Sequence, residues 1–336
     1  MQAVILNTFG NAENLVDASL PSRACGPGDV RISVKAVSFN PIDYQLRAGP
    51  AGNLHLPYIL GFDIAGIITE IGAAVIGLSP GDDVMAYLGG PALAGGYADE
   101  VVVPAAFVAP KPRNIGFAEA AAIPLTGLTA LQSLRRAGAG PTTSLLVAGA
   151  AGGAGSWMIR VARARGVTRI TATAGREESR RYLSEELGVG AERLIDHRDQ
   201  GGRTAAAIAA NGGRRYDIAV DCAGAAMTRL CCEAIALNGH VVSIVNGPAK
   251  EVEELLFERS AAFHSELVYA AAEYGAAADW LAYGRDLAEL AQWIEAGRLL
   301  LPRITVLGQF NAGIAREAHR MLESGKTLGK LVATWR

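Results

Sequence analysis

The stretch that decides the fold of this chain is Leu145-Leu146-Val147-Ala148-Gly149-Ala150-Ala151-Gly152-Gly153-Ala154-Gly155. Its four apolar residues predict a buried strand, its glycines predict a tight turn, and the residues that follow, 156–165, predict an amphipathic helix. A helix that starts directly after such a turn offers free backbone N–H groups, and its dipole favours an anion there. We therefore predict that Ala151, Gly152, Gly153 and Ala154 bind a dinucleotide pyrophosphate, although Ala150 replaces the first glycine of the G-x-G-x-x-G pattern.

The next predicted strand after the glycine turn ends near Thr173, and the residues at its end indicate which dinucleotide binds. Sites for NAD usually place an acidic residue there, about 20 residues after the glycine turn, for the ribose 2′-hydroxyl. This chain has Thr173 and Arg176 instead, with Arg180 one helical turn later, and guanidinium groups suit a 2′-phosphate. Glu177 and Glu178 would also suit a ribose, but acids in the first turn of a helix are common without a ligand. We predict NADPH as the cofactor, with NADH as the alternative.

The rest of the chain divides into two regions that differ in their predicted secondary structure. After residue 124 strands and helices alternate, which is typical of βαβ units and a parallel sheet. Before that point the chain reads as short strands and turns, which suggests a β-barrel-like unit. We predict an α/β protein that combines this β-barrel with a doubly wound parallel sheet of the Rossmann type. The expected boundaries are 1–122 for the barrel, 123–297 for the nucleotide-binding domain, and 298–336 for a return to the barrel.

Composition excludes several classes of protein. The 336 residues include 31 basic and 33 acidic side chains, for a net charge of −2. Half of all residues are hydrophobic. Such a balance argues against nucleic acid as the main partner and against disorder. The apolar stretches fall short of the ~20 residues that a membrane span needs, and the N-terminus has no secretory pattern, so we expect a cytoplasmic protein without a membrane partner. The four cysteines match neither a disulfide framework nor a zinc pattern.

Several further segments, taken with the glycine turn, resemble one family over essentially the whole chain. They are 37–49, which contains Asn40-Pro41-Ile42-Asp43-Tyr44, and 60–66, 96–100, 122–130 and 329–332. In this order they are similar to the zinc-independent medium-chain dehydrogenases/reductases of the quinone oxidoreductase (zeta-crystallin-like) group. The resemblance implies a GroES-like β-barrel catalytic domain, completed by the C-terminal tail, and a Rossmann domain. It also implies a homodimer formed through edge strands, for which we expect 264–270 to contribute.

The departures from the zinc-dependent relatives predict that no metal is bound. Those enzymes hold zinc with an early cysteine, a Gly-His-Glu and a later cysteine. Here the Gly-His-Glu position reads Gly61-Phe62-Asp63, and the early cysteine lies where this chain has Asn40-Pro41-Ile42-Asp43. Phe62 offers no ligand atom, and Asp63 alone provides too few ligands for zinc.

The resemblance also suggests which residues surround the nicotinamide. It implies that Asn40, Asp43 and Tyr44 line the cleft, and that Thr126 hydrogen-bonds the cofactor's carboxamide. Tyr44 is our candidate donor to the developing enolate, because a phenol is a suitable acid there. As alternatives, Tyr44 only shapes the cleft, Asn40 is a turn residue before a proline, and Asp43 pairs with Arg47 across one helical turn.

Three further residues follow from the same resemblance. His197 stands where the family commonly has an aromatic residue near the adenosine, and a surface histidine with no ligand is the alternative. Val245 and Asn246 are expected at the carboxyl end of a strand that passes the nicotinamide.

These observations together predict an enzyme that transfers a hydride from NADPH to a small quinone or α,β-unsaturated carbonyl without zinc. Such acceptors delocalise the negative charge of the product onto oxygen, so positioning and exclusion of water supply most of the catalysis. Two alternatives stay open, an enoyl-thioester reductase and a non-catalytic NADPH-binding protein.

Overall fold

The computed structural model of the protein describes residues 1–49, 54–91, 93, 95–245, 247–248 and 250–335. The chain forms two compact units, and both kinds of unit predicted from the sequence are present. The first unit contains Met1–Leu128, Tyr269–Arg298 and Ile304–Arg336, and the second contains Thr129–Val268 and Leu299–Arg303. Among the described residues, no helix is both long and apolar enough to cross a membrane.

The first unit is built on β-strands, as the alternating pattern near its start predicts. Its strands are β1 (Gln2–Leu6), β2 (Leu15–Ser19), β3 (Asp29–Phe39), β4 (Tyr58–Ile59), β5 (Asp63–Ile71), β6 (Asp83–Tyr87), β7 (Glu100–Pro104), β8 (Val108–Pro110), β15 (Ile304–Gln309) and β16 (Lys330–Thr334). One sheet has the order β15-β16-β3-β5-β6-β8, with β7 paired to β3, and a smaller sheet has the order β2-β1-β4. The C-terminal strand β16 pairs antiparallel with β3, so the end of the chain completes this unit.

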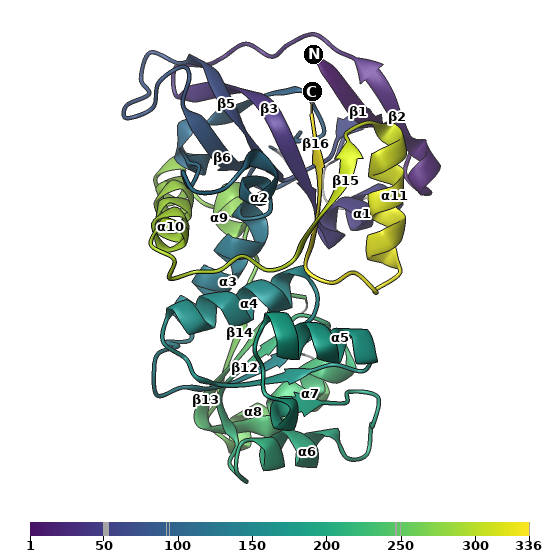
Figure 1. Ribbon diagram of the computed structural model, residues 1–336, viewed down its shortest axis with the longest axis vertical. Helices are drawn as coiled ribbons and strands as arrows, with labels where there is room; N and C mark the ends of the chain where they lie inside the picture. The colour runs from purple at the N-terminus through teal and green to yellow at the C-terminus, as the bar shows by residue number, and fades with distance from the viewer. Residues whose placement is uncertain (50–53, 92, 94, 246, 249, 336) are drawn as a thin grey trace. The chain divides into compact units, whose positions relative to one another are not determined.

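Helices pack around these sheets. They are α1 (Pro41–Ala48), α2 (Phe117–Ala121), α9 (Ala270–Tyr274), α10 (Ala277–Glu295) and α11 (Ala312–Glu323), with the short 3₁₀ segments η1 (Ala12–Asn14) and η2 (Ala105–Phe107). Helix α11 lies beside α1 and β2 (Figure 1). Helix α10 packs on η2 and β8, where the rings of Tyr283 and Phe107 stack at 5.1 Å. Because of this packing, the segment 269–298 groups with the first unit, whereas the sequence boundary at residue 297 assigned it to the second domain.

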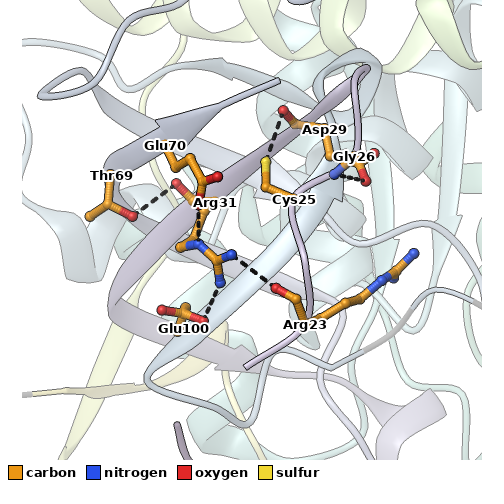
Figure 2. Close-up of polar contacts among 8 residues, drawn as sticks. All are labelled: Arg23, Cys25, Gly26, Asp29, Arg31, Thr69, Glu70 and Glu100. Atoms are coloured by element: carbon orange, nitrogen blue, oxygen red, sulfur yellow. Dashed lines mark hydrogen bonds and ion pairs between the residues drawn. The ribbon is translucent and has the colours of Figure 1, made fainter. Parts of the chain in front are cut away.

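The guanidinium of Arg31 connects three strands of the first unit through polar contacts (Figure 2). Arg31 on β3 donates to Glu70 on β5 at 2.7 Å and to Glu100 on β7 at 2.5 Å. Its third nitrogen donates to the backbone oxygen of Arg23 at 2.9 Å. Since β5 and β7 both pair with β3, this one guanidinium links the two neighbours of the same strand.

The second unit alternates strands and helices. Its strands are β9 (Ser144–Ala148), β10 (Arg169–Thr173), β11 (Leu194–Ile195), β12 (Tyr216–Asp221), β13 (Ile235–Ser243) and β14 (Ala262–Ser265). Its helical segments are α4 (Gly153–Ala164), α5 (Glu177–Arg181), η3 (Tyr182–Glu186), η4 (Ala191–Arg193), α6 (Arg203–Ala210), α7 (Ala226–Ala234) and α8 (Lys250–Glu258), and α3 (Pro124–Arg136) runs across the boundary between the units. The strands are parallel in the order β11-β10-β9-β12-β13-β14. Helices α4 and α5 cover one face of this sheet, and α7 and α8 cover the other (Figure 1).

Two expected helices of this unit end differently. The sequence pattern predicts a helix over 226–237 and a strand from residue 240, but α7 stops at Ala234 and strand β13 starts at Ile235, five residues earlier than predicted. The pattern over 179–187 predicts one helix, and the structure has α5 followed by one turn of π-helix, η3. The predicted α/β class, with a GroES-like β-unit and a parallel Rossmann sheet, is nevertheless confirmed.

Candidate functional site

The glycine-rich turn has the geometry that its sequence predicts. Strand β9 ends at Ala148, Gly149 adopts a positive φ of 75°, and α4 begins at Gly153. The N–H of Gly149 donates to Oγ1 of Thr173 at 3.0 Å, which holds the turn against the end of β10. A Cβ at Gly155 would lie 2.4 Å from the backbone oxygen of Gly149, so only glycine permits this close approach of helix and turn.

The start of α4 is open to an anion. Its N-cap is Gly152, which has no side chain to occupy the orphan N–H groups of the first turn. A Cβ at Gly152 would meet no atom closer than 3.8 Å, so the space beside it is free. Residues Ala151, Gly152, Gly153 and Ala154 are all half-buried. This arrangement fits the pyrophosphate of a dinucleotide.

A cavity of about 460 Å³ lies at the carboxyl ends of the central strands of the second unit. The chain leaves β9 and β12 in opposite directions across the sheet, and ligands of open α/β sheets bind at such a point. Thr173 and His197, both predicted site residues, line this cavity. Among the lining residues that the sequence did not predict are two arginines, Arg198 and Arg203, because nothing in the local pattern distinguishes them from surface arginines.

Four other residues predicted for the cofactor lie elsewhere or outside the description. Arg180 donates to the backbone oxygen of Leu194 at 3.3 Å, and Arg176 lies 3.9 Å from Glu178 on the same helix. Val245 follows the end of β13 and is 44% exposed. None of these three is among the residues that line the 460 Å³ cavity. Asn246 lies outside the described residues, so its predicted role stays a prediction.

The first unit brings Asn40, Asp43, Asp63 and Lys330 together, and we call this group the buried polar cluster. Asn40 donates from Nδ2 to Asp63 at 2.7 Å and accepts from Nζ of Lys330 at 2.6 Å. Nζ of Lys330 is also 3.5 Å from Oδ2 of Asp63. The Asp43 carboxylate accepts the backbone N–H groups of Asn40 at 2.7 Å and Gly61 at 3.0 Å. All four side chains are at most 2% exposed, and each is held by charge or hydrogen bonds.

Burial changes the acidity of these groups. It raises the pKa of Asp43 to about 7, although the two backbone donors and the Lys330 charge oppose the shift. Burial also raises the pKa of Asp63, against the neighbouring Lys330 charge, and lowers the pKa of Lys330, against the two carboxylates. The cluster therefore holds two carboxylates and one ammonium, and the Asp43 carboxyl is the group that titrates near neutral pH.

A second chain of hydrogen bonds reaches the cluster from α1 and α11. Nε of Arg47 donates to Nδ1 of His319 at 3.1 Å, so Nε2 of this histidine carries the proton and donates to Tyr97 Oη at 3.0 Å. The Tyr97 hydroxyl in turn bonds the Asp43 carboxylate. Burial, with the Arg47 charge, lowers the pKa of His319 to about 3, so the ring is neutral at physiological pH. The predicted alternative pair of Asp43 with Arg47 is wrong, because Arg47 binds His319 and forms its ion pair with Glu323.

The predicted nicotinamide-side residues have different surroundings. Asn40 caps α1, and it and Asp43 are 1% and 0% exposed with their side chains engaged in the buried polar cluster. Tyr44, one residue further along α1, is only half-buried. Thr126 on α3 donates from Oγ1 to the backbone oxygen of Ala122 at 3.3 Å. Of the three residues predicted on α1 and at its cap, Tyr44 is thus the one whose side chain is partly exposed.

The donor set beside Asp63 does not fit zinc. Phe62 is fully buried and carries no ligand atom, and Oδ1 of Asp63 accepts the N–H of Leu125 at 2.6 Å. Oδ2 of Asp63 is shared by Asn40 and the Lys330 ammonium, whose charge repels a cation. Over the part of the chain that the structure describes, no three His, Cys, Asp or Glu side chains come together as a metal would need.

Comparisons with known proteins agree with this architecture. A family profile described as zinc-binding dehydrogenase matches residues 189–332, and one described as alcohol dehydrogenase GroES-like domain matches residues 26–113. A chloroplast envelope quinone oxidoreductase homolog of Arabidopsis thaliana is 31% identical over 261 residues, which cover 74% of this chain and 76% of the relative. The chain belongs to the quinone oxidoreductase-like medium-chain dehydrogenases/reductases. The resemblance found in the sequence is confirmed.

Two more members of the medium-chain dehydrogenase/reductase family show the range of similarity. An NADPH-dependent alkenal/one oxidoreductase of Arabidopsis thaliana chloroplasts is 34% identical over 206 residues, or 59% of this chain and 52% of the relative. The solved quinone oxidoreductase of Coxiella burnetii has a TM-score of 0.82 and 27% identity, and the match covers 100% of this chain and 99% of that one. Rossmann domains of this family bind a nicotinamide cofactor, which agrees with the open glycine turn described above.

Proposed function

We propose that this member of the family is an NADPH-dependent reductase of quinones or α,β-unsaturated carbonyls that works without zinc. The proposal rests on which residues form the buried polar cluster. Where zinc-dependent relatives have a Gly-His-Glu, this chain has Phe62 and an Asp63 paired with the Lys330 ammonium. Oxidation of an alcohol needs a Lewis acid or a strong proton relay to stabilise the alkoxide, whereas a quinone or an enone does not.

The residues of the second unit support a nicotinamide dinucleotide as the reductant. The N–H groups at the start of α4 would bind its pyrophosphate, and the cavity lined by Thr173 and His197 would hold its adenosine ribose. When bound, the cofactor supplies a hydride to the acceptor. Thr126 would hold the carboxamide, as the resemblance implies.

The proposed roles on α1 follow from burial. The Tyr44 hydroxyl donates a hydrogen bond to the acceptor oxygen that gains negative charge. Asn40 and Asp43 are positioning residues, because their side chains are enclosed and fix the start of the helix that carries Tyr44. Asp43 joins that start to the backbone of Gly61, so α1 cannot shift without breaking buried hydrogen bonds.

A panel of acceptors tests this function. Anaerobic oxidation of NADPH and of NADH is followed with a benzoquinone, a 2-alkenal and a crotonyl thioester of coenzyme A as parallel acceptors. We expect turnover with the quinone or the alkenal, and faster oxidation of NADPH than of NADH. Exclusive turnover of the thioester would establish the enoyl-thioester reductase instead, and binding of NADPH without turnover of any acceptor would establish a non-catalytic binder.

Substitution of Tyr44 tests its role in the same assay. Tyr44→Phe removes the hydroxyl and should lower kcat by about 100-fold, as loss of one oxyanion donor does. The matched control is Tyr274→Phe on α9, where the side chain is 81% exposed. Equal kcat values for Tyr44→Phe and the parent protein would reduce Tyr44 to a residue that shapes the site.

We also propose that the protein is a homodimer. Strand β14 is the last strand of the parallel sheet and leaves one edge without a partner strand among the described residues, in the segment where the sequence predicts dimerisation. Light scattering should give twice the mass of one chain. A monomeric mass at micromolar concentration would contradict this proposal.

A further inference from the structure

The cavity of the second unit contains a buried guanidinium that forms no hydrogen bond or ion pair with the residues that the structure describes. Arg203, the first residue of α6, is 9% exposed and lines the cavity. Its backbone N–H donates to the oxygen of Asp199 at 3.0 Å, but its guanidinium has no hydrogen bond or ion pair with the described residues. A buried charge of this kind is costly unless an anion or water satisfies it.

The carboxylates nearby are already engaged. Asp196 binds Arg198 through two contacts, at 2.9 Å and 2.6 Å, and so neutralises the other arginine of the cavity. Glu233 accepts from Thr204 at 2.6 Å and from Arg229 at 2.7 Å. The Arg203 charge helps to lower the pKa of Glu233, so the two groups attract each other through space. Among the described residues, however, no carboxylate forms an ion pair with Arg203, whereas Arg198 is paired.

Arg203 lines the same cavity as Thr173, the last residue of β10, and His197. A Cβ at Gly175 would lie 2.7 Å from Cε1 of His197 and 3.1 Å from Cγ of Arg198. The His197 ring thus fills the space of a side chain at the end of the second strand, where NAD-binding sites place their carboxylate. Thr173, which also lines the cavity, accepts the N–H of Gly149. No carboxylate lines the cavity to receive the ribose 2′-hydroxyl.

We propose that the Arg203 guanidinium binds the 2′-phosphate of NADPH in this cavity and so determines the choice of NADPH over NADH. A guanidinium and a phosphate monoester form bidentate, charge-assisted hydrogen bonds, and the phosphate would satisfy the otherwise unpaired cation. The inference rests on the proposed NADPH-dependent function and assigns the phosphate to Arg203 in place of Arg176 and Arg180. Arg180 lies on α5 and Arg176 is its N-cap, and neither is among the residues that line the cavity.

Binding of nucleotide fragments tests the assignment without any turnover. Isothermal titration calorimetry of the full chain is carried out with adenosine 2′,5′-bisphosphate, adenosine 3′,5′-bisphosphate and 5′-AMP. The intact protein should bind the 2′,5′-bisphosphate most tightly. Arg203→Gln should weaken that nucleotide by about tenfold or more while 5′-AMP changes less than about twofold, because only the 2′-phosphate contact is lost.

Three more variants sharpen the experiment. Arg176→Gln tests the competing assignment from the sequence, and Arg181→Gln, an exposed arginine of α5, is the matched control. We expect both to keep the preference for the 2′,5′-bisphosphate. Arg203→Lys keeps a cation and should lose less affinity than Arg203→Gln, which provides a test should Arg203→Gln fail to fold; thermal unfolding of each variant checks this.

The outcomes that contradict the assignment to Arg203 differ from those that contradict the proposed function. An unchanged preference in Arg203→Gln, or its loss in Arg176→Gln, would overturn the assignment to Arg203 and leave the reductase function standing. Tighter binding of the 3′,5′-bisphosphate would indicate the phosphate of a coenzyme A substrate instead of that of NADPH. Failure of all three nucleotides to bind the intact protein would contradict the proposed function itself.

Discussion

The buried polar cluster of the first unit and the cavity of the second unit both enclose positive charge, but they treat it differently. Lys330 is 2% exposed and contacts the oxygens of Asn40, Asp63 and Phe39. Arg203 is 9% exposed and has no such contact among the described residues. A buried cation that is fully paired holds the fold, whereas one that is left unpaired in a cavity is available to a ligand. We therefore expect Lys330 to stabilise the fold and Arg203 to serve ligand binding.

The largest expected effect is the loss of the paired charge. Lys330→Met leaves the two buried carboxylates without their ammonium partner and should lower the free energy of unfolding by about 3–5 kcal/mol. Urea denaturation at pH 8 measures the change, and Lys326→Met, at an exposed position of the same tail, is the control. The loss should shrink at pH 5, because Asp43, whose pKa is raised to about 7, is protonated there. A loss below about 1 kcal/mol at pH 8 would show that Lys330 is not required by the cluster.

An intermediate effect is expected from the hydrogen-bonded chain that supports the cluster. The folded-state pKa of His319 is about 3, against an ordinary value of 6.5, so its contribution to stability is complete above pH 6.5 and is lost as the pH falls towards 3. Asp43, whose pKa is raised to about 7, has the opposite dependence, with stability lost as the pH rises from about 4 to 7. The two slopes oppose each other in the parent protein.

His319→Gln should therefore reveal the slope of Asp43 alone. Relative to the parent protein, the variant should gain up to ~1.4 kcal/mol in the free energy of unfolding for each pH unit below 6.5. Denaturation series between pH 7 and pH 4 measure this difference. His55→Gln, at an exposed histidine, should change nothing over the same range. Parallel pH profiles for His319→Gln and the parent would contradict the neutral, buried state of this ring.

The smallest expected effect on stability belongs to the unpaired charge. Arg203→Met removes a cation that has no hydrogen bond or ion pair among the described residues and only a through-space attraction to Glu233, so the free energy of unfolding without ligand should stay within about 0.5 kcal/mol or rise. Thermal unfolding with and without adenosine 2′,5′-bisphosphate measures it, and the stabilisation by this nucleotide should fall in the variant to that given by 5′-AMP. A clear destabilisation of the ligand-free protein would place Arg203 with the structural charges and remove the contrast.

The sequence predicted the second unit better than the details of the first. Strand, turn and helix around Gly149 follow from local patterns, because apolar runs and glycines specify backbone geometry directly. The buried polar cluster joins residues up to 290 positions apart, such as Asn40 and Lys330, and no local pattern reports a long-range hydrogen bond. Arg203 was missed for the same reason, since it lines the cavity together with residues far from it in the chain, such as Gly149 and Thr173. Asn40 and Asp43 were noticed, but only the structure places their side chains in an enclosed network.

We propose that this chain reduces its acceptor without a metal, with a lysine–carboxylate cluster at the position where zinc-dependent relatives have a Gly-His-Glu. The most direct test is anaerobic stopped-flow oxidation of NADPH by a benzoquinone before and after treatment with a zinc chelator, with total zinc measured on the same sample. We predict rapid oxidation at an unchanged rate and far less than one zinc per chain. One zinc per chain, or a rate that the chelator abolishes and added zinc restores, would contradict the claim.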